Sequence, residues 1–170
     1  MAGRNATLSH VGGDGRARMV DVGAKPVARR TATAAAVVRV SAALARAIRA
    51  NVLKKGDLLG VARLAGIQAA KRTDELIPLC HPLPIDAIDV RVVLRGREVR
   101  IGASVSTSAR TGVEMEALTA AAVAALAVID MGKSVDQGMV VEGPRVVEKS
   151  GGRRGDYVAP RPRARTRGGR

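Results

Sequence analysis

The chain has 170 residues, of which 46% are hydrophobic, and it carries a net charge of +14. This length suffices for one domain with a buried core, and that core must be aliphatic because the chain has no Phe or Trp and a single Tyr. One Cys excludes an intramolecular disulfide and fits a reducing compartment, and one Cys with two His argues against a zinc site within one subunit. The longest apolar run, residues 117–129, is shorter than the roughly 20 residues that cross a bilayer, and the N-terminus lacks the apolar segment of a signal peptide. We therefore expect a cytoplasmic protein.

The positive charge is concentrated at the C-terminus. Residues 151–170 contain seven Arg and one Asp, and residues 159–170 have almost no apolar side chains. We expect 159–170 to be a disordered Arg/Pro-rich tail that binds nucleic acid only non-specifically, and residues 1–158 to form a single domain. That domain keeps an excess of positive charge, which suits a highly anionic small ligand.

The first half of the chain predicts one strand and two helices. About 30 N-terminal residues look irregular, and residues 31–40 then alternate as a half-buried strand does. Ser41 is a plausible N-cap for a short helix over 42–50, and Asp57 can cap a second helix that runs to about Arg72.

The second half predicts a hairpin, a long helix and a last strand. Residues 87–94 and 98–107 alternate and are joined through Arg95-Gly-Arg97. A helix rich in Ala follows from Thr111-Gly112 to about Val135, and a short strand covers roughly 145–149. The order β-α-α-β-β-α-β predicts an α+β fold, a ferredoxin-like split βαβ sandwich whose antiparallel sheet has helices packed on one face.

The segment 76–84, Leu-Ile-Pro-Leu-Cys-His-Pro-Leu-Pro, contains the only Cys and three of the seven Pro. Stiff prolines leave Cys80 and His81 few backbone options, as a functional site needs, although an ordinary connector has the same composition. Adjacent residues on an extended backbone point to opposite sides, which argues against a nucleophilic Cys–His pair.

The long helix carries acidic residues near both of its ends. Glu114 and Glu116 point about 200° apart, so only one can share the apolar face; both also fit a helix N-terminus for dipole reasons alone. Asp130 lies three positions before Lys133 and follows the apolar run, so we expect it to be partly desolvated. This pair is either a general acid/base or a surface ion pair.

Helix geometry separates these two groups. Glu116 and Asp130 are 14 residues apart in the sequence, or about 21 Å along a continuous helix. They cannot act on one small atom within a single subunit. Either they contact opposite ends of a long ligand, or a second subunit completes the site.

Five motifs, taken in order, resemble the MoaC family of cyclic pyranopterin monophosphate synthases. They are Lys55-Gly-Asp57, Ala62-Arg-Leu-Ala-Gly-Ile-Gln-Ala-Ala-Lys-Arg-Thr73, Leu76-Ile-Pro-Leu-Cys-His-Pro-Leu83, Thr111-Gly-Val-Glu-Met-Glu-Ala-Leu-Thr119 and Lys149-Ser-Gly-Gly152. The resemblance covers residues 8–157, nearly everything outside the tail. Several long motifs in the same order make it specific.

The resemblance implies an enzyme of molybdenum cofactor biosynthesis. Members of this family are lyases that convert 3′,8-cyclo-7,8-dihydro-GTP to cyclic pyranopterin monophosphate and release diphosphate, with no metal or redox cofactor. They have a ferredoxin-like subunit and assemble as hexamers of three dimers, with active sites at the dimer interface.

The resemblance also implies roles for particular residues. Asp130 corresponds to the principal acid/base, and Lys55 and Lys133 look like its catalytic partners. The other matching positions correspond to substrate-binding residues, with Arg30 and Lys149 toward the phosphates: Leu79, Cys80, His81, Glu114, Met115, Glu116, Arg30 and Lys149.

The chain departs from the family pattern at three places. Gly132 stands where many members have Cys, Ile129 where relatives often have an aromatic residue, and Arg153-Arg154 where Lys-Ser is common. None of these changes removes a residue assigned above.

A basic nucleic-acid-binding module is the rival interpretation, but a chain with one Tyr lacks the aromatic platforms on which single strands stack. A catalytically silent homologue used for assembly is a third, and the retained Lys55, His81, Asp130 and Lys133 argue against it.

Overall fold

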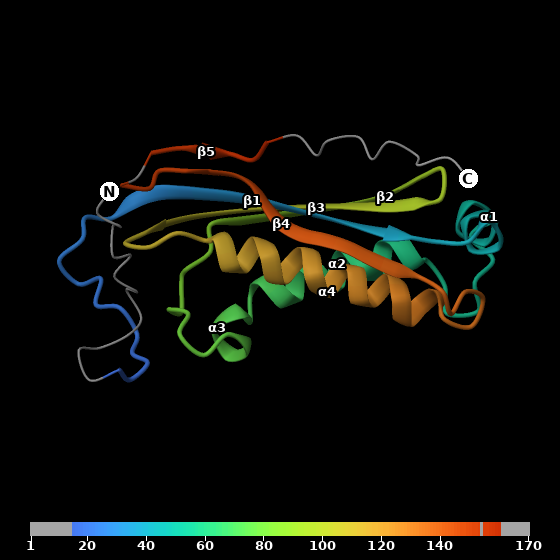
Figure 1. The fold of residues 1–170 in the computed structure, drawn as a ribbon, viewed down its shortest axis with the longest axis horizontal. Helices are drawn as coiled ribbons and strands as arrows, with labels where there is room; N and C mark the ends of the chain where they lie inside the picture. The colour runs from blue at the N-terminus through green and yellow to red at the C-terminus, as the bar shows by residue number, and fades with distance from the viewer. Residues whose placement is uncertain (1–14, 154, 161–170) are drawn as a thin grey trace, which may run out of the picture.

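A five-stranded antiparallel sheet extends along the molecule, with its strands in the order β2-β3-β1-β4-β5 (Figure 1). The computed structural model describes residues 15–153 and 155–160. In chain order the elements are β1 (Ala28–Arg39), α1 (Ala42–Ala50), α2 (Leu58–Ala70), α3 (Thr73–Leu76), β2 (Ala87–Arg95), β3 (Glu98–Ala109), α4 (Glu114–Gly132), β4 (Val140–Ser150) and β5 (Tyr157–Val158). Helices α2 and α4 lie on one face of the sheet, and α1 lies near one end (Figure 1). The predicted ferredoxin-like sandwich is confirmed.

Alternation along β1 builds the interface between the sheet and the helices. Ala32, Ala34, Ala36 and Val38 are buried, and the residues between them are more exposed. In β3 the register pairs Ala34 with Ala103, which is also buried. These short side chains allow α4 to pack closely on the sheet, since neither surface has large groups to hold them apart.

Boundaries differ from the predictions where the local pattern is broken. Strand β4 is longer than the predicted 145–149 because Gly143, with φ +50°, and Pro144 accompany a register shift that interrupts the alternation. The helix predicted from Asp57 to about Arg72 is α2, and the sequence did not predict the short helix α3 that follows it. The Thr73 hydroxyl donates to the carbonyl oxygens of Ala69 and Ala70 at the junction of the two helices. Helix α4 is two to three residues shorter at each end than predicted. The two-residue strand β5 had no sequence signal.

The first half of the irregular N-terminal segment, residues 1–14, and most of the predicted tail 159–170 lie outside the described residues. By length and composition α4 alone, among the described helices, could cross a membrane. More than half of its apolar window is buried against the sheet and α2, as in the core helix of a globular domain.

Gly66 allows α2 and α4 to come into close contact. A Cβ at this position would lie 2.9 Å from the carbonyl oxygen of Ala120 and 3.3 Å from the Ala124 Cβ. We predict that Gly66→Ala lowers the free energy of unfolding by about 1–3 kcal/mol, because α2 must move away from α4. Thermal and urea unfolding measure the change. Gly102→Ala is the control, since a Cβ there meets nothing within 4 Å; equal stabilities of the two variants would contradict the packing account.

Candidate active site

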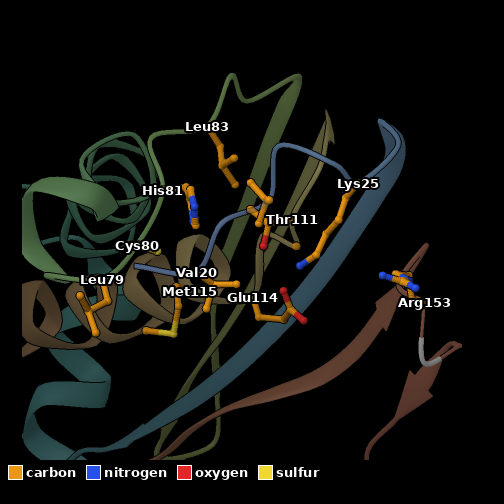
Figure 2. Close-up of a pocket in the computed structure, with 12 residues that line it drawn as sticks. Val20, Lys25, Leu79, Cys80, His81, Leu83, Thr111, Glu114, Met115 and Arg153 are labelled. Atoms are coloured by element: carbon orange, nitrogen blue, oxygen red, sulfur yellow. The ribbon is translucent and has the colours of Figure 1, made fainter. Parts of the chain in front are cut away.

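A cavity of about 720 Å³ lies at the N-terminal end of α4 (Figure 2). Its walls come from the N-terminal segment, the loop between α3 and β2, and the start of α4. A turn closed by the Cys80 N–H and the Ile77 carbonyl (3.0 Å) shapes the loop, and the Thr107 hydroxyl of β3 donates to the Pro84 carbonyl. Three residues assigned from the 76–84 segment line this cavity: Leu79, Cys80 and His81. The stiff segment is therefore a wall of the cavity.

A smaller cavity of about 170 Å³ adjoins the first, between α4 and the end of β4. Lys149 lines it and forms an ion pair of 2.9 Å with Glu114, the first residue of α4. Gly151 follows with φ +79°, and a Cβ there would lie 2.0 Å from the Arg29 carbonyl oxygen. Only glycine allows the chain to pass this close to β1.

Arg30 lies beside this second cavity on the helix-covered face of β1. It is only 8% exposed, and its Nε has no hydrogen-bond partner among the described residues. A Cβ at Gly152 would be 3.8 Å from Arg30 Nη1, so the glycine-rich segment passes next to the guanidinium. A buried guanidinium with an unused donor favours an anionic ligand at this end of the molecule.

Burial favours the uncharged forms of Glu116 and Cys80. Glu116 is 3% exposed and its Oε2 lacks a partner among the described residues. Burial raises the pKa of this carboxyl, with Glu114 and Asp74 adding to the shift. Burial also raises the pKa of the Cys80 thiol, with Glu116 contributing. The thiol stays protonated at neutral pH, which removes the thiolate that a Cys–His nucleophile would need.

Asp130, Lys55 and Lys133 form a separate cluster at the C-terminal end of α4. Lys55 Nζ lies 2.8 Å from Asp130 Oδ2 and 2.9 Å from the Asp130 carbonyl oxygen, and Lys133 Nζ lies 2.8 Å from Oδ1. Lys55 reaches this position from the loop before α2, where Gly56 has φ +87°. The i,i+3 pair predicted from the sequence is therefore present and gains a second ammonium.

The expectation that Asp130 is desolvated is wrong. Its side chain is 58% exposed, because the apolar run before it faces the sheet while Asp130 itself turns toward solvent. Hydrogen bonds from Lys133 and then Lys55 instead lower the pKa of the carboxyl to about 2. Asp130 is therefore a carboxylate at neutral pH.

The assigned residues thus fall into two groups at opposite ends of α4. Because α4 is continuous from Glu114 to Gly132, about 21 Å of helix separates Glu116 from Asp130. One group comprises Leu79, Cys80, His81, Glu114, Met115, Glu116, Arg30 and Lys149; the other comprises Lys55, Asp130 and Lys133. A single copy of the chain does not bring the two groups together.

The structure adds cavity residues that the sequence did not indicate. Val20, Val22 and Lys25 line the larger cavity from the irregular N-terminal segment, where no periodicity or motif marked them. Figure 2 shows the Lys25 ammonium extending toward the Glu114 carboxylate. Arg153, which departs from the family pattern within the basic, glycine-rich segment 150–155, lines both cavities.

Packing accounts for the departure at Gly132. A Cβ there would lie 2.7 Å from Leu44 Cδ2 and 3.2 Å from Met139 Cε. A side chain at this position would therefore require the flexible ends of Leu44 and Met139 to move. Nothing in the structure explains Ile129 in place of an aromatic residue.

Comparison with known proteins identifies the family. The family model described as MoaC family matches residues 19–152. The chain belongs to the MoaC family. A cyclic pyranopterin monophosphate synthase from Nocardioides sp. is 53% identical over 156 residues, covering 90% of this chain and 96% of that protein. Proteins of the same name from Streptomyces avermitilis (51% identical, 88% of each chain) and Novosphingobium aromaticivorans (49%, 89% of this chain and 97% of that protein) are similarly close. Both groups of assigned residues lie within the part that the MoaC family model matches.

The raised pKa of Glu116 gives a pH-dependent prediction. A carboxyl whose folded pKa exceeds its unfolded value stabilises the fold fully below the unfolded pKa, and this contribution is lost as the pH rises through the folded pKa. We predict that the stability of Glu116→Gln relative to wild type increases from about pH 4 to pH 7, because the amide never ionises. Urea unfolding at several pH values measures it. Exposed Glu75→Gln is the control; parallel pH profiles for the two variants would disprove the assignment.

Proposed function

We propose that this protein is a cyclic pyranopterin monophosphate synthase, a phosphorus–oxygen lyase of molybdenum cofactor biosynthesis. It converts 3′,8-cyclo-7,8-dihydro-GTP to cyclic pyranopterin monophosphate and releases diphosphate. The proposal is carried by membership of the MoaC family together with identities near 50% to relatives of that name over about nine-tenths of the chain. The two residue groups at the ends of α4 supply the chemistry that this reaction needs.

The cavity at the N-terminal end of α4 holds the substrate. Leu79 and Met115 offer apolar contacts to the purine-derived ring system, and His81 offers a hydrogen-bonding group. The neutral carboxyl of Glu116 can donate as well as accept a hydrogen bond. Arg30 and Lys149 lie where the phosphates would extend, beside the smaller cavity. Their charge offsets the negative charge that accumulates on the departing diphosphate.

The cluster at the other end of α4 moves protons. With a pKa of about 2, the Asp130 carboxylate accepts a proton at neutral pH but has none to donate. Lys55 and Lys133 present their ammonium protons on either side of it. Ring opening by water, closure of the new ring and expulsion of diphosphate all require proton transfers, and this cluster combines a base with two acids.

A second copy of the chain brings the two groups into one site. Apolar side chains at Met115, Leu118, Ala122, Leu126 and Ile129 form a stripe along the outer side of α4, and Leu126 is 59% exposed. This stripe begins in the substrate-binding group and ends beside Asp130. Antiparallel pairing of two such stripes about a two-fold axis near Ala122 places Asp130 of one copy opposite Met115 of the other.

The assembly that we propose is a homohexamer made of three such dimers, in the cytoplasm. The proposed reaction does not involve nucleic acid. Its excess positive charge is instead matched by the triphosphate of the substrate.

Turnover of the cyclised GTP derivative tests the function. Wild type should release diphosphate and the cyclic pterin phosphate, and Asp130→Asn should lose at least about 100-fold in kcat while keeping its oligomeric state, because the base is removed. Asp89→Asn is a matched control: Asp89 also forms a 2.9 Å ion pair, with Arg91, and is 60% exposed, but it lies on edge strand β2. A wild-type protein without product, under conditions in which a relative is active, would refute the function. Near-normal turnover in Asp130→Asn would refute the role of Asp130.

A further inference from the structure

Arg153 sits at the boundary between the two cavities. Gly112, Glu114 and Arg153 are the residues that line both of them. Figure 2 shows Arg153 on the β4 side of the larger cavity, with Glu114 between it and His81 in this view. A ligand that extends from the larger cavity into the smaller one must therefore pass Arg153.

The backbone around Arg153 fixes its position. The Gly155 N–H donates to the Gly152 carbonyl (3.0 Å), which closes a turn with Arg153 at its second position. The Gly151 N–H donates to Asp156 Oδ1 (3.3 Å), and Gly151 and Gly155 both have positive φ. Gly151 lies close to the Arg29 carbonyl oxygen, and the turn that follows places the Arg153 side chain at the boundary between the two cavities.

Positive charge at this boundary exceeds the negative charge available to neutralise it. Glu114 is paired with Lys149, and burial raises the pKa of the Glu116 carboxyl and so favours its neutral form. Arg153 makes no salt bridge within the described residues, and neither does Lys25 across the larger cavity. Arg30 is only 8% exposed, and its Nε, next to the same glycine-rich segment, has no hydrogen-bond partner in the part of the chain that the structure describes. Such convergence of unpaired cations is suited to an anion with several charges.

We propose that Arg153 binds the outer phosphates of the substrate and thereby distinguishes a triphosphate from a monophosphate. Lys149 contacts the chain of phosphates inside the smaller cavity, Arg30 lies beside that cavity, and Arg153 binds the part that leaves as diphosphate. A guanidinium makes two parallel hydrogen bonds to a phosphate, which the Lys that is common at this position in relatives does not. The identification of the anion as diphosphate rests on the proposed function, whereas the anion site itself rests on the geometry.

Direct binding of diphosphate tests the proposal without turnover. Isothermal titration of the full chain with inorganic diphosphate, GTP and GMP should show that Arg153→Ala weakens binding of diphosphate and GTP about 10- to 100-fold, which is the range for lost hydrogen bonds to a charged group. Binding of GMP should change less than about threefold. Arg153→Lys should lose part of the affinity, because it keeps the charge but not the planar fork. Arg63→Ala, on the exposed side of α2, is the charge-matched control and should bind as wild type does.

The outcomes separate this proposal from the proposed reaction. Selective loss of diphosphate and GTP binding in Arg153→Ala supports the site even if wild type fails to turn over the cyclised GTP derivative. Wild-type affinity for diphosphate in Arg153→Ala, or an equal loss for all three ligands, overturns the assignment of Arg153 even if turnover is normal. A wild-type protein that turns over the substrate yet binds no diphosphate at millimolar concentration also overturns the assignment of Arg153.

Discussion

The length of the continuous helix α4 sets the separation between the two groups of candidate functional residues. Its 19 residues have neither a Pro nor an internal break, so the groups at its ends are held apart by a fixed length of helix. Within one copy of the chain, Asp130 and the larger cavity therefore lie at opposite ends of α4. A reaction that needs both must therefore recruit the second end from another copy of the chain, and the apolar stripe on the outer side of α4 gives that copy a surface to cover.

The packing of α4 against the sheet and α2 explains how so apolar a helix is held in a single position. Small side chains in β1 and β3 pack against α4 on the sheet side, and Gly66 of α2 allows close contact with α4 on another side. One buried carboxyl, Glu116, interrupts the apolar packing near the N-terminal end of α4, and burial raises its pKa and so favours its protonated form. The fold thus combines a closely packed aliphatic core with two polar ends, to which we assign the proposed chemistry.

Much of this architecture was predictable from the sequence, because alternation and helix caps are local signals. Residues 31–40, the hairpin around Gly96 and the caps at Ser41 and Asp57 all appear as predicted. Strand β4 was predicted too short because Gly143 and Pro144 break the alternation, and β5 has only two residues, which leave no pattern.

The site was only partly predictable, since motif resemblance identifies residues but not their surroundings. Asp130 was expected to owe its properties to desolvation, whereas two ammonium groups at an exposed position lower its pKa. Lys25 gave no signal because it lies in an irregular segment that only the tertiary fold brings to the cavity. Arg153 lies in a basic, glycine-rich segment, and only the tertiary structure shows that it lines two adjoining cavities.

Subunit complementation tests most directly the claim that two copies build each active site. Asp130→Asn and His81→Ala chains carrying different tags are each purified, mixed under conditions of subunit exchange, and the doubly tagged oligomers are assayed for turnover. If Asp130 and His81 act from different copies, each mixed dimer contains one intact site and should have about half of wild-type activity, or about a quarter for hexamers in which subunits pair at random, although both parent proteins are inactive. If both residues act from the same copy, every site keeps a lesion, and activity that stays at the level of the parents would contradict the account.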